Sequence, residues 1–599
     1  MIEAWTLMSA AAHITRGIVG TATTSDRRTT SPYPSLLTSM SLAPSDALRR
    51  WQSAQGRLAN VIQEYADACT VLENSLEQGD PDEDTISTFD TLLPGLSRHE
   101  DALRTARLGL VKTRNPSHAM TPIHKLHPDI LMTIFTLASQ EWISMDFEEL
   151  DDEPVSATTL ASVCSLWRQL LLQAPVFWSN IDIVLTGPMS ERDYERAQAW
   201  AERAQSAPLW LTIQDVLVDE EDIEREPREQ VLPDSVITRI LDFSTPLMPF
   251  VRTLAIHIED SIPTALVHAL LGCWIRHHSP GVAERLELHI DFGVPEMDMG
   301  IPVISPVSQS SDLHSDEVAP FLKSLRGVYL ENVDIDFRHV PYSGLTDLHI
   351  EFSNQTGWLP AQQDLARLFK ANPGLRSLTL ENMTLGPGGR VTTPVPLDFL
   401  QKLRLEALDD GDLGRVLALI SSSSPALRMA VTIGDGNHLG CVAEAQAFFS
   451  RTRVTVLFVD SGLGPEEPDS PITALFAHMP YLHTLTLQSC NLSVSGLNDF
   501  AEWCSSQNGS VNPWPALRKL NLFQCDTTPE IVRRITQVQN IQTLGLFEPQ
   551  MWSVMPVWNS GWANTNVRTV VEQELLQRGI KMIWYSPSGQ DLPSWTFVD

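Results

Sequence analysis

A short phrase of the form Leu-x-x-Leu-x-Leu recurs through the second half of this 599-residue chain. Alternation of leucine with other residues is typical of a strand that buries one face. One such strand is not stable alone, so the copies are expected to stack side by side into a parallel sheet. The copies stand at 251–256, 325–330, 345–350, 375–380, 400–405, 454–459, 482–487, 517–522 and 541–546, with weaker ones at 284–288 and 427–433.

The residues between copies must return over one side of that sheet. Their apolar spacing predicts helices at 365–370, 413–420 and 472–477. Prolines stand shortly before several copies, where they would end a helix and favour an extended chain. These prolines are Pro373, Pro425, Pro480 and Pro515.

Several copies continue into a turn that carries a small polar residue, Asn382, Cys490 or Cys525. This pattern resembles the leucine-rich repeat, in which such a side chain bonds the turning backbone. The copies are unevenly spaced, so we expect an irregular α/β solenoid with a parallel sheet over residues 251–599. A helix at 571–578, the cap Gly579 and a strand at 581–585 would close it. The alternative is an ordinary α/β domain with leucine-rich strands.

Toward the N-terminus, we expect a disordered tail at 1–43 and then a helical segment at 44–115. Apolar residues recur at spacings of three, four and seven from about Ser45 to Leu76, which indicates an amphipathic helix. Gly79-Asp80-Pro81 breaks this helix, and a second runs over about 85–111. We expect an antiparallel hairpin within one chain; the alternative is a coiled coil that dimerises the protein.

Residues 126–178 combine two short apolar helices and an aromatic close. Leu126-His-Pro-Asp-Ile-Leu-Met-Thr-Ile-Phe135 places Pro128 where a first helical turn accepts it. Val163-Cys-Ser-Leu-Trp-Arg-Gln-Leu170 and Pro175-Val-Phe-Trp178 follow. A unit of about 50 residues is too small to bury all of this apolar surface alone, so a partner is expected to cover it.

The pattern resembles the F-box, the three-helix module that joins substrate receptors to the Skp-type adaptor of cullin ubiquitin ligases, here over residues 121–182. Two features depart from the family pattern: His127 stands at a usual proline, and the acidic stretch 146–153 lengthens a loop. A hairpin before the module is similar to that of many fungal F-box proteins. The alternative is a plain helical hairpin inside a larger core. The adaptor contacts implied by the resemblance are Leu126, Pro128, Ile130, Leu131, Ile134, Phe135, Val163, Cys164, Trp167, Arg168 and Trp178.

Composition and motifs argue against several classes of function. The formal charge of −32 disfavours a nucleic-acid or anionic membrane surface. Seven scattered cysteines without a Cys-x-x-Cys pair fit the reducing cytoplasm or nucleus. No catalytic motif, cofactor fingerprint or metal-ligand set is recognised, and no membrane span is expected. His277-His278 lacks further ligands, and Gly386–Gly389 reads as a turn.

The resemblance implies a substrate-recognition subunit of a cullin-type ubiquitin ligase. The F-box would bind the adaptor and through it the cullin, the repeats would bind a substrate protein, and residues 183–250 would connect them with a helix at 193–207 and a strand at 210–213. Such a receptor acts by proximity, without catalytic residues of its own. The alternatives are an interaction scaffold outside the ligase and a hydrolase within 250–599.

Overall fold

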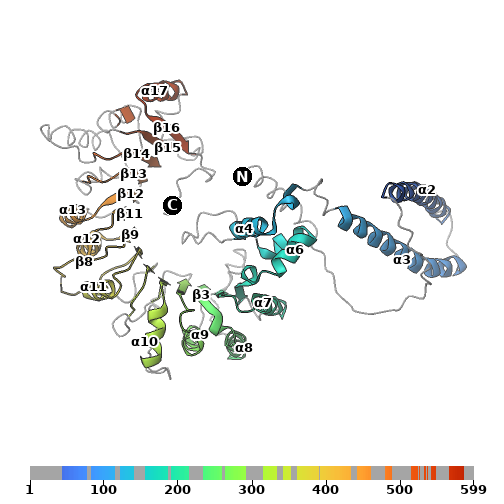
Figure 1. Cartoon of the computed structure of the whole chain (residues 1–599), viewed down its shortest axis with the longest axis horizontal. Coiled ribbons are helices and arrows are strands. Elements are labelled where there is room, and N and C mark those ends of the chain that lie inside the picture. Colours follow the sequence, from blue (N-terminus) through green and yellow to red (C-terminus); the bar gives the residue numbers. More distant parts are fainter. Residues whose placement is uncertain are drawn as a thin grey trace. The chain divides into compact units, whose positions relative to one another are not determined.

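The structure is a computed structural model, shown in Figure 1. No helix among the described residues is long and apolar enough to cross a membrane. The described residues are 44–76, 83–114, 122–139, 156–185, 191–214, 234–259, 264–291, 315–333, 342–352, 360–389, 391–433, 441–460, 479–488, 515–523, 525, 532–533, 536, 541–547 and 565–585.

Fourteen strands of the described residues form one sheet, in which every neighbouring pair is parallel and the strands follow in chain order. The predicted α/β class with a large parallel sheet is therefore confirmed. The strands are β1 (Asn180–Val184), β2 (Leu209–Gln214), β3 (Val251–Glu259), β4 (Arg285–Asp291), β5 (Gly327–Glu331), β6 (Asp347–Glu351), β7 (Ser377–Glu381), β9 (Lys402–Leu408), β11 (Leu427–Ile433), β12 (Val454–Asp460), β13 (Thr484–Gln488), β14 (Lys519–Phe523), β15 (Thr543–Phe547) and β16 (Lys581–Tyr585).

In the described part of the chain, a helix lies between many of the successive strands, and Figure 1 shows α10, α11, α12 and α13 on the same side of the sheet. Leu365 and Phe369 of α11 are buried, as are Leu378 and Leu380 of β7, so the core lies between helices and leucines. The predicted helix at 472–477 lies outside the described residues. The described helices that lie between strands of the sheet are α7 (Glu191–Ala204), α8 (Asp234–Ser244), η4 (Met248–Phe250), α9 (Thr264–His277), α10 (Ser315–Ser324), α11 (Gln362–Ala371), α12 (Asp410–Leu419), α13 (Val442–Arg451) and α17 (Thr565–Gln577).

The sheet begins earlier in the chain than the sequence predicts. β1 and β2 both belong to it, so residues assigned to a connecting segment at 183–250 contribute to the first strands. β1 alternates buried and half-buried residues over only five positions, directly after the F-box-like motif. A separate pair of two-residue strands, β8 (Val395–Pro396) and β10 (Ile420–Ser421), is also parallel.

Turns at the strand ends depend on residues that accept a left-handed backbone. Asn332 and Asn382 have φ of 53° and 50°, a region that asparagine tolerates better than most residues. Cys525 donates from Sγ to the carbonyl of Leu487 at 3.3 Å, as the leucine-rich-repeat resemblance implies for such a residue. Gly579 has φ of 77° after α17, which confirms the predicted cap.

A second compact unit contains the N-terminal helices and part of the F-box-like segment. The predicted helices at 44–76 and 85–111 both form. Their apolar side chains, including Val61 and Leu92, are exposed, so the packing of a hairpin stays a prediction. The division between the units passes through α4, after Ile134. The helices of the F-box-like segment and the region before it are α2 (Pro44–Leu76), α3 (Glu83–Arg114), η1 (Pro122–Lys125), α4 (Pro128–Ser139), α5 (Ala157–Val163), α6 (Ser165–Leu172) and η2 (Pro175–Trp178).

His127 takes the N-terminal cap of α4, at the position where the F-box pattern usually has proline. Its Nδ1 accepts a hydrogen bond from the backbone N–H of Asp129 at 3.3 Å. Its carbonyl accepts from the backbone of Ile130 and Leu131. A side-chain acceptor at this position satisfies a helix N–H that would otherwise lack a partner, so His127 caps the start of the helix.

Candidate functional site

The sheet face opposite the leucines carries glutamates on four neighbouring strands. Glu331 of β5 is in register with Glu351 of β6, Glu351 with Glu381 of β7, and Glu381 with Glu406 of β9. Neighbouring strands lie about 4.8 Å apart, so the four carboxylates stand side by side. We call these four residues the carboxylate row.

Histidines continue the same line on the N-terminal side of the row. His257 of β3 is in register with His289 of β4, and His289 with Glu331. Two residues earlier on each strand, a second line of side chains shares this face, because strand side chains alternate with a period of two. This second line contains Glu287, Tyr329, His349, Thr379 and Arg404.

Three of the four carboxylates in the row have a basic partner. Glu331 pairs with Nδ1 of His289. Glu351 lies 3.3 Å from Nε2 of His349, measured from Oε2. Glu406 accepts a hydrogen bond from Arg404 at 2.7 Å.

Glu381 differs from the other three members. Among the described residues its carboxylate makes no hydrogen bond or ion pair. The pKa of Glu381 is raised to about 8, chiefly by burial and also by the neighbouring charges of Glu351 and Glu406, against a smaller lowering effect of Arg404. A carboxyl group in this position is held partly protonated near neutral pH, because its charge would face two like charges with little water.

The histidine end of this face has the opposite character. The pKa of His257 is lowered to about 4, chiefly by burial and also by the neighbouring His289. Glu287 lies 4.0 Å from His257, which would favour the charged imidazole, but burial outweighs this attraction. Burial also raises the pKa of Glu287 itself, against the lowering effect of Arg285.

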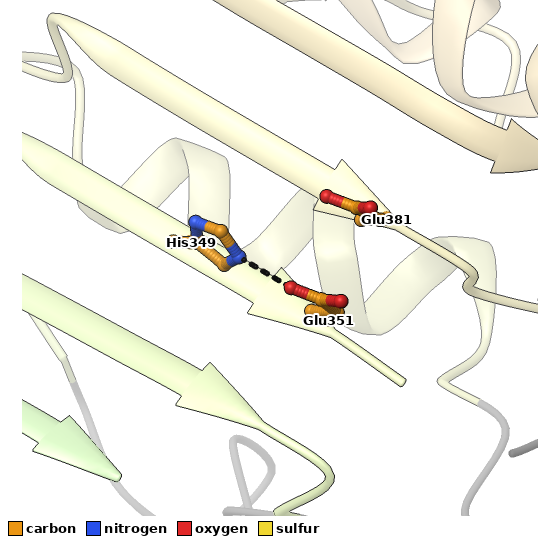
Figure 2. A group of neighbouring side chains, drawn as sticks. All are labelled: His349, Glu351 and Glu381. Carbon is orange, nitrogen blue, oxygen red and sulfur yellow. Dashed lines mark hydrogen bonds and ion pairs between the residues drawn. The ribbon is translucent and has the colours of Figure 1, made fainter. Parts of the chain in front are cut away.

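Three groups in the middle of this face could hold a metal ion. Ligand atoms of His349, Glu351 and Glu381 all lie within 4.8 Å of one another. Figure 2 shows the imidazole of His349 beside the Glu351 carboxylate, with Glu381 on the adjacent strand. Imidazole nitrogen and carboxylate oxygen are ligands for divalent transition metals, so the arrangement has the chemistry of a three-ligand site.

The sequence did not predict these residues. Each member of the row directly follows the last apolar residue of a Leu-x-Leu phrase, as in Ile350-Glu351 and Leu380-Glu381, and this regularity was the available signal. The histidine pair considered for metal binding is not completed: His277 is exposed, and His278 packs against Phe321 with a centroid distance of 5.0 Å. The turn predicted at Gly386–Gly389 is bonded by Arg415, whose Nη2 donates to the Gly386 carbonyl at 2.7 Å.

The predicted adaptor contacts differ in their exposure. Ile130 and Val163 are about half exposed, at 49% and 51%. Trp178 is buried, and its Nε1 donates to the carbonyl of Leu171 at 2.9 Å. Pro128 and Arg168 are exposed, Leu126, Ile134 and Cys164 are half-buried, and Leu131, Phe135 and Trp167 are buried.

These exposures separate two roles within the F-box-like segment. The exposed members are available to a partner, whereas the buried ones hold the helices. Cys164 supports α6, since its Sγ accepts from the backbone N–H of Trp167 at 3.4 Å. The expected second helix is divided here, with Val163 at the end of α5 and Trp167 in α6.

No model of a known protein family matches the chain, and no curated protein matches it either.

Proposed function

We propose that this protein is a substrate receptor of a cullin-type ubiquitin ligase, which binds a Skp-type adaptor through the helices of residues 126–178 and a substrate protein through the repeat sheet. The observation that carries the proposal is the exposed apolar surface of these short helices. Ile130 and Leu137 lie seven residues apart on α4, hence on one face, and are 49% and 62% exposed. Leu131 and Phe135 of the same helix are buried.

A helix that is apolar on both its buried and its exposed face supports an interface. Val163 of α5 and Leu166 of α6 add exposed apolar side chains to the same segment. An ordinary solvent-facing helix presents polar residues on that side. The order of the motif, Pro-x-Ile-Leu followed by Val-Cys-x-x-Trp-Arg and Phe-Trp, resembles the F-box, and this resemblance supports a Skp-type adaptor as the partner that covers these residues.

The repeat sheet supports the substrate-binding half of the proposal. Its face opposite the helices is lined by charged and polar side chains over many neighbouring strands. Solenoids use such extended faces to bind other proteins. The proposed compartment is the cytoplasm or nucleus, where the free cysteines of the described residues would stay reduced.

Co-expression with a fungal Skp-type adaptor, followed by pull-down and size exclusion, tests the adaptor half. The wild-type chain is expected to form a one-to-one complex. Ile130→Asp combined with Val163→Asp should weaken it at least about 100-fold, because burying each apolar side chain contributes roughly 1.5–3 kcal/mol. Both substituted side chains are exposed and the buried Trp167 is unchanged, so the variant is expected to keep its fold.

Val61→Asp is the matched control, because Val61 is 58% exposed on α2, outside the motif. This control should bind the adaptor like the wild type. Unchanged binding by the double variant, or a wild-type chain that forms no complex, contradicts the proposal. Adaptor binding without recruitment of the cullin would instead support a scaffold that acts outside the ligase.

A further inference from the structure

We propose that His349, Glu351 and Glu381 form a binding site for one divalent transition-metal ion, with Zn²⁺ as the ion best suited to these donors. The site is separate from the adaptor-binding helices, and the proposal does not depend on the ligase assignment. It rests on the positions of three side chains on two adjacent strands, on the charges around them and on the donor types.

The strands fix the three donors on one face. His349 and Glu351 are two residues apart on β6, so both side chains leave the same side of the sheet. Glu381 is the register partner of Glu351 on β7. Both strands lie inside the sheet with partners on each side, which holds the backbone of the site firmly in place.

The distances match a small coordination sphere. With Zn–N and Zn–O bonds of about 2.0–2.2 Å, two donors of a tetrahedral ion stand roughly 3.3–3.5 Å apart. His349 Nε2 and Glu351 Oε2 are 3.3 Å apart, so this pair already has that separation. The third donor lies within 4.8 Å of the others, and a side-chain rotation of Glu381 would bring it into the sphere (Figure 2).

The charges around the site favour a cation. Glu381 stands between Glu351 and Glu406 and, within the described part of the chain, has no basic partner for its carboxylate. The nearest arginine of the second line, Arg404, is bonded to Glu406. A divalent ion between Glu351 and Glu381 would neutralise both carboxylates and remove their mutual repulsion.

The donor types select the class of ion. Ca²⁺ prefers six to eight oxygen ligands, and Mg²⁺ prefers an octahedron of oxygens, whereas an imidazole with two carboxylates suits Zn²⁺ and its first-row neighbours. Three protein ligands leave a fourth position for water or for a donor from a bound partner. That open position lies on the sheet face we propose for substrate binding.

Isothermal titration of the tag-free full chain with ZnCl₂ tests the site, after treatment with a chelator and dialysis. One site is expected in the wild type, and both His349→Ala and Glu381→Gln should weaken it at least tenfold. Glu381→Gln keeps the shape of the side chain and removes a repelling charge, so this variant should fold at least as well as the wild type. Thermal unfolding and circular dichroism verify the fold of each variant.

His289→Ala is the matched control, because His289 pairs with Glu331 on the same face, two strands from His349. This variant should bind Zn²⁺ like the wild type. Co²⁺ provides a second readout, since a tetrahedral site gives strong visible absorption bands that the two site variants should lose. Equal binding by wild type and site variants, or loss only in His289→Ala, would overturn the proposal, as would a wild-type chain without the single site.

Discussion

Replacing His257 by glutamine should make the sheet unit less sensitive to acid. The imidazole is only 23% exposed and is surrounded by Gln214 of β2 and by Glu287 and His289 of β4. Its pKa in the folded chain is lowered to about 4 from an ordinary value of 6.5. Between these two pH values the unfolded chain binds more protons at His257 than the folded chain does, so stability must fall as the pH falls through this window.

The size of the effect follows from the two pKa values. Between pH 7 and pH 5, linkage gives an upper limit of about 2 kcal/mol of lost unfolding free energy. Partial exposure and the nearby Glu287 carboxylate reduce this, and we expect about 1–2 kcal/mol. With an unfolding entropy of about 2.1 cal/mol/K per residue over roughly 400 residues of the sheet unit, each kcal/mol changes the thermal midpoint by about 1 °C.

The assay is the thermal midpoint of wild type and His257→Gln, measured by tryptophan fluorescence at half-unit steps from pH 5 to pH 8. Other groups titrate in both proteins, so the quantity of interest is the difference between the two midpoints. This difference should change in favour of the variant by about 1–2 °C between pH 7 and pH 5. An exposed histidine, in His483→Gln, is the control and should show no such change. A difference for His257→Gln that stays constant with pH would refute the reasoning.

Two further predictions concern the fold of the repeats. Asn372→Ala should lower the unfolding free energy by about 3 kcal/mol, because the buried amide accepts from Leu345 N–H at 2.8 Å and donates to the carbonyls of Tyr342 and Leu368. Urea unfolding measures this loss of stability. A loss below about 1 kcal/mol would contradict the stabilising role of the Asn372 side chain. Gly579→Ala should lower the unfolding free energy by about 1–2 kcal/mol, since φ of 77° is unfavourable for alanine. Gly374→Ala is the control, because Gly374 has open space around it and no such backbone angle, and it should lower the unfolding free energy less. Equal losses in the two variants would argue against Gly579 as the helix cap.

The leucine phrase was enough to predict most of the sheet. β7 begins two residues after Leu375, where the phrase starts, and β16 has the predicted bounds of 581–585. These strands can be predicted from the sequence because burial of one face requires apolar residues at alternate positions. β1 was missed because Asn180–Val184 is short and follows an unrelated motif directly.

The candidate metal site was much less predictable than the strands. Glu351 and Glu381 are thirty positions apart in the sequence, and their proximity comes only from the stacking register of β6 and β7. No local pattern relates His349 to Glu381. The exposure of the adaptor-contact residues was equally hidden, because the motif marks Ile130 and Leu131 alike while the fold exposes one and buries the other.

The carboxylate row is not a requirement of the solenoid. The buried core of the repeat needs its leucines but not these glutamates. The later strands β12, β13 and β14 end in Asp460, Gln488 and Phe523, which are register partners of one another, without a run of glutamates. Two ionised carboxylates about 4.8 Å apart repel each other by about 3 kcal/mol at an effective dielectric constant of 20. Histidine and arginine partners offset this repulsion at three positions of the row, whereas Glu381 has only the weaker, unbonded attraction of Arg404. An unfavourable group of like charges is typical of binding surfaces rather than of packed cores. A cation bound at Glu381 would offset the repulsion between the carboxylates of neighbouring strands and so stabilise the sheet.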